Sequence, residues 1–87
     1  MAERIPTVSL GLMANDPETY IRRIIAQRIN SDDLELLGKD SGWTVRYEVA
    51  KRASPALLQQ MIDDVEEEVR LIARQRYEAF SLGNNVA

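Results

Sequence analysis

The sequence predicts an all-α protein built from about three 24-residue repeats that stack into a short solenoid. The first observation is that residue types recur at a spacing of 24 along most of the chain. The second is that the apolar residues of each repeat follow the period of an α-helix, whereas no segment alternates with the period of a β-strand. Because one such unit is too short to bury its own apolar side chains, neighbouring units must cover one another.

Six columns of the repeat hold identical or similar residues in all three copies. The columns are Leu10, Leu34 and Leu58; Met13, Leu37 and Met61; Asp16, Asp40 and Asp64; Ile21, Val45 and Val69; Arg22, Arg46 and Arg70; and Arg28, Arg52 and Arg76. The 87 residues are therefore expected to form a single domain over residues 1–87. Its units are expected at about residues 6–29, 30–53 and 54–80.

The first part of each unit is expected to be a short α- or 3₁₀-helix. It contains two apolar residues three positions apart, such as Leu34 and Leu37, which fall on one side of a helical turn. Ser31 and Ser54 are predicted to be the N-caps of these helices, and Pro55 to take the first helical position.

The second part of each unit is expected to be a longer amphipathic helix. In the first unit Asp16 is the predicted N-cap and Pro17 the first helical residue, and Asp40 and Asp64 take the place of Asp16 in the later units. Apolar residues then recur at every fourth position, which is typical of a helix with one buried face. These stripes are Ile21, Ile25 and Ile29; Val45, Val49 and Ala53; and Val69, Ala73 and Tyr77.

The two ends of so short an array need a cover, because the terminal units have only one neighbour. Residues 1–5 are expected to form a flexible arm, and residues 81–87, with Gly83, a helix stop and a flexible tail. Phe80 and Leu82 are the predicted cover of the last unit, and Tyr20 is expected to pack. An uncovered end would allow the chain to form homo-oligomers.

The composition excludes several classes of chemistry. The chain has no cysteine and no histidine, so disulfides, cysteine-ligated clusters, zinc hydrolysis and Cys–His or Ser–His catalysis are excluded. Carboxylates leave calcium open, but the acidic run at 63–68 lacks the glycine and spacing of a calcium loop and suits a helix start. A net charge of −3 disfavours nonspecific nucleic-acid binding. With no membrane span or signal peptide in the sequence, we expect a cytoplasmic protein without cofactor or metal.

The order of a short and a longer helix, the period of 24 and the aspartate six positions before an arginine together resemble the leucine-rich repeat variant family. The resemblance covers about residues 6–80 and implies a right-handed superhelix of alternating 3₁₀- and α-helices. It rests on Leu34, Leu37, Asp40, Val45, Arg46, Val49 and Ala50 and their counterparts in the neighbouring units. The family includes a protein with a cysteine-ligated [4Fe–4S] domain from a nitrogen-fixing bacterium, but a chain without cysteine is not expected to hold the cluster.

The row of Arg22, Arg46 and Arg70 admits two interpretations. The spacing to the aspartate column also resembles HEAT-class repeats, in which such residues form a hydrogen-bonded ladder between units. The alternative is a basic row that binds phosphate or nucleic acid. The ladder is favoured, because the column of Asp16, Asp40 and Asp64 keeps the same period beside the arginines. The row of Arg28, Arg52 and Arg76 is expected to bind the C-terminal carbonyls of its own helices, or Asp32 or Asp33.

Residues that do not recur are the candidates for a specific function, since the shared columns serve the stacking of the units. They are Arg23, Trp43, Tyr47 and Glu48, with Trp43 expected in the loop before the second long helix and close to Tyr47. Trp43 is expected to be either a local plug of the core or a contact residue, and the sequence favours neither. Trp, Tyr and Arg are enriched in interface hot spots. The sequence therefore predicts a non-enzymatic protein-interaction module whose partner is another protein. The family resemblance implies an accessory or regulatory protein of a bacterium, with nitrogen fixation as one setting. Nucleic-acid binding through the arginine rows and an enzyme that works with carboxylates are the alternatives.

Overall fold

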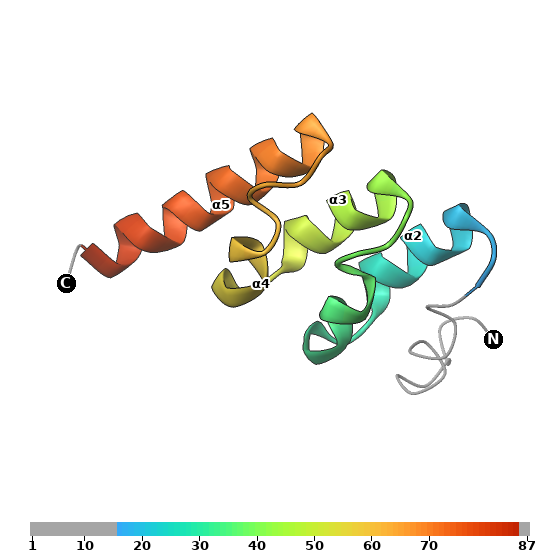
Figure 1. Cartoon of the computed structure of the whole chain (residues 1–87). Coiled ribbons are helices and arrows are strands. Elements are labelled where there is room, and N and C mark those ends of the chain that lie inside the picture. The colour runs from blue at the N-terminus through green and yellow to red at the C-terminus, as the bar shows by residue number, and fades with distance from the viewer. Residues whose placement is uncertain (1–15, 86–87) are drawn as a thin grey trace.

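The computed structural model describes residues 16–85, and within this range every regular element is a helix (Figure 1). The elements are α2 (Thr19–Arg28), the 3₁₀-helix η2 (Ser31–Leu37), α3 (Trp43–Arg52), α4 (Pro55–Gln59) and α5 (Glu67–Asn85). The three long helices follow one another side by side, and the short elements η2 and α4 lie together along one side of them (Figure 1). The predicted arm at residues 1–5 and the first short helix within residues 6–15 lie outside the described residues.

The elements begin at the spacing of the sequence columns. The long helices begin at residues 19, 43 and 67, and the short ones at residues 31 and 55, so that each interval is 24 residues. α3 packs against both α2 and α5, while η2 contacts α3 and α4 contacts α5. The same order of a short and a long helix thus recurs along the described chain.

The repeated aspartates lie three residues before the long helices and are not their N-caps, so this prediction is wrong, as is Pro17 as the first helical residue. Each carboxylate instead accepts a hydrogen bond from the amide two residues further on, which forms an Asx turn. The pairs are Asp16 with Glu18 at 2.9 Å, Asp40 with Gly42 at 2.8 Å and Asp64 with Glu66 at 2.9 Å. The two residues that follow each aspartate belong to this turn, so each long helix begins three residues after its aspartate.

The two short helices begin differently from each other. The Ser54 hydroxyl accepts a hydrogen bond from the amide of Leu57 at 3.5 Å, and Pro55 is the first helical residue, which confirms the predicted cap. Ser31 is wrong as an N-cap, since it is the first residue of η2 and Asn30 precedes it without a side-chain hydrogen bond.

The predicted helix stop at residues 81–85 is wrong, because α5 continues to Asn85 and is 19 residues long, whereas α2 and α3 have 10 residues each. A glycine ends a helix when it adopts the left-handed conformation, and no glycine among the described residues has a positive φ. An isolated glycine inside a helix costs only about 1 kcal/mol, so the helix passes through Gly83. Residues 86 and 87 lie outside the described range.

The core is one continuous cluster between the long helices and the short ones. The predicted stripes are confirmed, because all their residues are buried except Ile21 and Tyr77, which are partly buried against the cluster. The buried side chains are Ile25, Ala26, Ile29, Leu34, Leu37, Val45, Val49, Ala50, Ala53, Leu58, Met61, Val69 and Ala73. Tyr20 is 68% exposed, so its expected packing role is wrong.

Candidate functional site

The first row of arginines connects each long helix to the start of the next. Arg22 on α2 donates from Nε to Oδ2 of Asp40 at 2.7 Å and from Nη2 to Oδ1 at 3.0 Å. Arg46 on α3 binds Asp64 in the same way, at 2.8 Å and 3.0 Å. The side chains of Arg46 and Asp64 are only 12% and 9% exposed. Two largely buried, bidentate ion pairs therefore hold the three long helices in sequence.

Each arginine of this row also binds the backbone before its own helix. The Nη1 bonds join Arg22 to the carbonyl of Asp16 at 2.9 Å, Arg46 to that of Asp40 at 2.7 Å and Arg70 to that of Asp64 at 2.9 Å. Arg70 lies on the last helix, and its other hydrogen bond goes to the carbonyl of Val65 at 3.1 Å. Arg70 thus keeps the local contact of the row without the ion pair to a following helix.

The environment of Asp64 favours its ionised form. Burial raises its pKa, but the hydrogen bonds from Arg46 and from the amide of Glu66, with the charges of Arg46 and Arg70, more than offset burial. The pKa of Asp64 therefore lies below its ordinary value. The pair with Arg46 stays charged throughout the neutral range.

The second row of arginines binds helix C-termini, but those of the preceding helix. Arg52 donates from Nη1 to the carbonyl of Ala26 at 2.8 Å. Arg76 donates from Nη1 to the carbonyls of Ala50 and Ala53, both at 2.8 Å. The expected bonds to their own helices, or to the acids of the short segments, are replaced because the neighbouring helix presents its last carbonyls within reach. The exposed side chain of Arg28 makes no hydrogen bond to residues 16–85.

One position of the repeat changes its chemistry at the last unit. Ala26 and Ala50 are fully buried on α2 and α3, each of which has a following helix packed against it. The equivalent residue of α5 is Arg74, which donates from Nε to the carbonyl of Ile62 at 2.8 Å and reaches Asp63 at 3.4 Å. The outer side of α5 thus holds a large charged side chain where the other long helices hold a methyl group.

Trp43 and Tyr47 lie together on α3. Trp43 is the first residue of that helix, so its predicted place in the preceding loop is wrong. The two rings meet edge to face, with centroids 6.4 Å apart and planes at 78°. Trp43 is 39% exposed, and the Lys51 ammonium lies 5.4 Å from the centre of the Tyr47 ring. Residues four apart on one face of a helix thus form an aromatic pair with a cation beside it, in which Trp43 is exposed and Tyr47 is partly buried against the core.

Glu48 is 4% exposed, so its predicted role as a surface contact residue needs correction. Its carboxylate binds Lys51 at 2.9 Å and Arg23 of α2 at 3.3 Å. Burial raises the pKa of Glu48, but the hydrogen bonds from Lys51, Gln27 and Arg23 outweigh burial and hold the pKa below its ordinary value. Glu48 is a buried anion that fixes two surface cations beside the aromatic pair.

We name Arg23, Trp43, Tyr47 and Lys51 the Trp43 face; Tyr47 is partly buried, and the other three are exposed. They border a shallow cavity of about 290 Å³, which Thr44 and Glu68 also line. Sequence reasoning found three of the four and missed Lys51. Lys51 could have been found, because it follows Tyr47 by four residues on a predicted helix, and residues at that spacing lie on the same side.

No protein-family model, curated protein or solved structure matches this chain. The resemblance to the leucine-rich repeat variant family therefore rests on the sequence columns alone. In the described part of the chain, no helix combines the length and the apolar character needed to cross a membrane. Over the same residues, no three acidic side chains come together in a way that would hold a metal ion.

Proposed function

We propose that this chain is a short right-handed solenoid of about three units and that it acts as a non-enzymatic protein-interaction module through the Trp43 face. Two facts support the solenoid: the helices begin 24 residues apart, and the same arginine contacts recur between successive long helices. The family resemblance implies the same architecture. Short repeat arrays commonly bind partners on a surface made by several units.

The aromatic pair of Trp43 and Tyr47 is the observation that carries the functional proposal. Trp43 is 39% exposed, and Tyr47 beside it is partly buried and packs against the edge of the core, which holds the pair in place. Arg23 and Lys51 beside it are held by the buried Glu48. Large side chains that are already fixed lose little conformational entropy on binding, which is the property of interface hot spots.

The same contacts favour protein binding over the two alternatives. Arg22 and Arg46 direct their guanidinium groups at Asp40 and Asp64, so these arginines are engaged within the chain and offer little to phosphates. Glu48 is held as an anion between two cations, which suits a supporting role better than that of a general acid.

The proposal is tested by affinity capture from extracts of the source organism, with quantitative mass spectrometry. The wild-type chain is compared with Trp43→Ala and with Leu36→Ala, a control that removes another exposed apolar side chain (60% exposed) from η2. We expect a protein that is enriched by the wild type and by Leu36→Ala and lost with Trp43→Ala. Circular dichroism confirms that the variants fold. If a folded Trp43→Ala variant captures the same proteins as the wild type, the Trp43 face is not the binding surface.

A further inference from the structure

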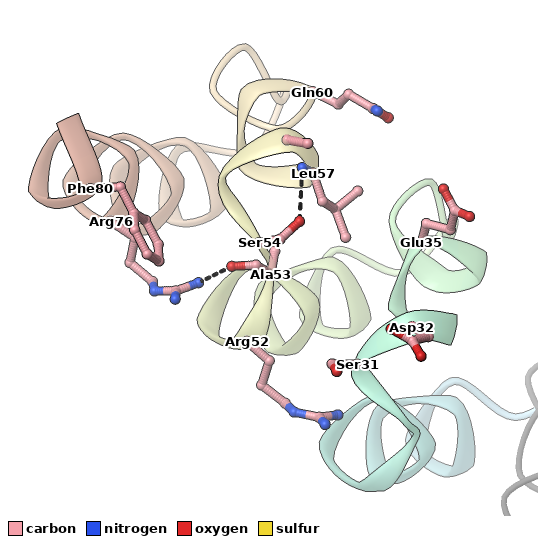
Figure 2. Close-up of a pocket in the computed structure, with 11 residues that line it drawn as sticks. Ser31, Asp32, Glu35, Arg52, Ala53, Ser54, Leu57, Gln60, Arg76 and Phe80 are labelled. Carbon is pink, nitrogen blue, oxygen red and sulfur yellow. Dashed lines mark hydrogen bonds between the residues drawn. The ribbon is translucent and has the colours of Figure 1, made fainter. Parts of the chain in front are cut away.

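A second cavity, of about 480 Å³, opens between the C-terminal ends of α3 and α5 and the short helices (Figure 2). Arg52 and Arg76 of the second arginine row line one part of it, and Asp32 and Glu35 of η2 line another. Ser54, Leu57 and Phe80 are also at its surface. None of these residues belongs to the Trp43 face, so the cavity is a separate feature of the molecule.

The two arginines are fixed in place but keep part of their hydrogen-bonding capacity. Each guanidinium uses only Nη1 for its backbone bonds, which leaves Nε and Nη2 without a hydrogen bond among the described residues. Neither has a carboxylate within ion-pair distance in the same part of the chain, unlike Arg22 and Arg46. Figure 2 shows Arg76 reaching toward Ala53, with Phe80 beside it. Both arginines therefore carry a positive charge that nothing in the described chain neutralises by direct contact.

We propose that this cavity binds an acidic peptide segment of another protein in an extended conformation, with one carboxylate on Arg52 and one on Arg76. A guanidinium that is already oriented binds a carboxylate through paired hydrogen bonds. Arg52 and Arg76 lie on adjacent helices, whose axes are about 8–10 Å apart. A chain in the extended polyproline II conformation advances about 3.1 Å per residue and has three residues per turn, so two acidic residues three positions apart lie on the same side, about 9 Å from each other.

The remaining lining favours a peptide over a nucleic acid. Asp32 and Glu35 would repel a continuous phosphate backbone, whereas a peptide offers amide groups or a basic side chain to them. Leu57 and Phe80 provide apolar surface for a side chain between the two acids. The Arg76 guanidinium lies 5.4 Å from the centre of the Phe80 ring, so this surface adjoins the binding charge.

Fluorescence anisotropy with a defined probe tests the proposal. The probe is a short labelled peptide with Glu-Leu-Ser-Glu at its centre, and the control peptides carry Gln-Leu-Ser-Gln or adjacent glutamates. We expect the first peptide to bind at low ionic strength, and Arg52→Gln and Arg76→Gln to weaken it about tenfold each. Arg74→Gln is the matched control, since it also removes a charge and a 2.8 Å bond to a carbonyl, but lies outside the cavity.

Two further measurements separate binding from folding. Asp32→Lys changes an exposed side chain on the acidic wall, so it should leave the fold intact and tighten the Glu-Leu-Ser-Glu peptide severalfold. Amide chemical shifts should move at residues 52–57 and 76–80 and not at residues 43–47. The proposal is overturned if no peptide binds, if Arg74→Gln weakens binding as much as Arg76→Gln, or if either control peptide binds as tightly as the Glu-Leu-Ser-Glu peptide. It is also overturned if an oligothymidylate of equal charge binds more tightly, which would make the cavity a phosphate site.

Discussion

Arg46 and Arg70 occupy equivalent positions and differ by one contact, which makes them a matched pair of residues. Both donate to the carbonyl of an aspartate six residues earlier, but only Arg46 also binds a carboxylate on the next helix. Arg46→Met should lower the free energy of unfolding by about 3 kcal/mol, because it leaves Asp64 largely buried without its cation. Arg70→Met, which removes two bonds to backbone carbonyls and a weaker charge interaction with Asp64, should cost about 1 kcal/mol. Urea denaturation measures both changes in the free energy of unfolding. Equal losses would show that the ion pair with Asp64 contributes no stability beyond that of the bonds to backbone carbonyls.

The lowered pKa values of Asp64 and Glu48 predict a loss of stability in acid. Because both folded pKa values lie below those of the unfolded chain, the unfolded chain binds more protons as the pH falls. Stability should therefore be constant near neutral pH and decrease below about pH 5. Asp64→Asn should be less stable at pH 7 and show a smaller decrease between pH 5 and pH 3. Urea titrations at several pH values measure this, and parallel curves for the two proteins would contradict it.

At the scale of single residues, the sequence was informative where a column repeats and uninformative where it does not. The pairing of arginines such as Arg22 with aspartates such as Asp40 is predictable, because two columns with the same period keep the same relative position in every unit. Glu48 has no such counterpart, and its type alone indicated a solvent-exposed charge. Glu48 is buried because α2 packs beside it and brings Arg23 to its carboxylate. The apolar pattern of α3 alone does not predict which residue of α2 will lie there.

At the scale of the elements, the starts of α2 and α3 approach each other closely at Gly42. A Cβ atom at Gly42 would lie 2.7 Å from Cγ2 of Thr19, the first residue of α2, and 3.3 Å from Oδ1 of Asp40. Gly42→Ala should therefore destabilise the chain by about 1–3 kcal/mol, because the two helix starts must separate. Thr19→Ser removes the obstructing methyl group, so Gly42→Ala should cost clearly less in that background. Urea denaturation of the four proteins gives the coupling, and purely additive effects would exclude the predicted clash.

The existence and order of the helices were predictable from the period of their apolar residues, but their ends were not. Asp16 and Asp64 indicated helix starts, and the true starts lie three residues later because each carboxylate forms an Asx turn. Gly83 indicated a stop, and α5 continues through it. An aspartate or a glycine near a helix end is compatible with several backbone conformations, and tertiary packing selects among them.

For the whole molecule, α3 is the element with the most support. Among residues 16–85, α3 packs against α2, α5 and η2, whereas α2 and α5 each pack mainly against one other long helix. In hydrogen exchange followed by mass spectrometry, amides in the middle of α3 should therefore exchange most slowly. The last turns of α5, where Ser81, Leu82 and Gly83 are exposed, should exchange fastest. Uniform protection of α3 and the end of α5 would indicate a single cooperative unit without weaker ends.

Arg74 gives the array a defined end. A stack of similar units has no intrinsic length, since the outer side of each unit resembles the side that the next unit already covers. Ala26 and Ala50 permit close approach of another helix, whereas Arg74 places a charged and bulky group at that point. Adding a further copy there would require a cation to be stripped of water and displaced from its carbonyl. The arginine at position 74 thus disfavours the packing of a further helix on this side of α5, much as inward charges on edge strands discourage the addition of strands to sheets.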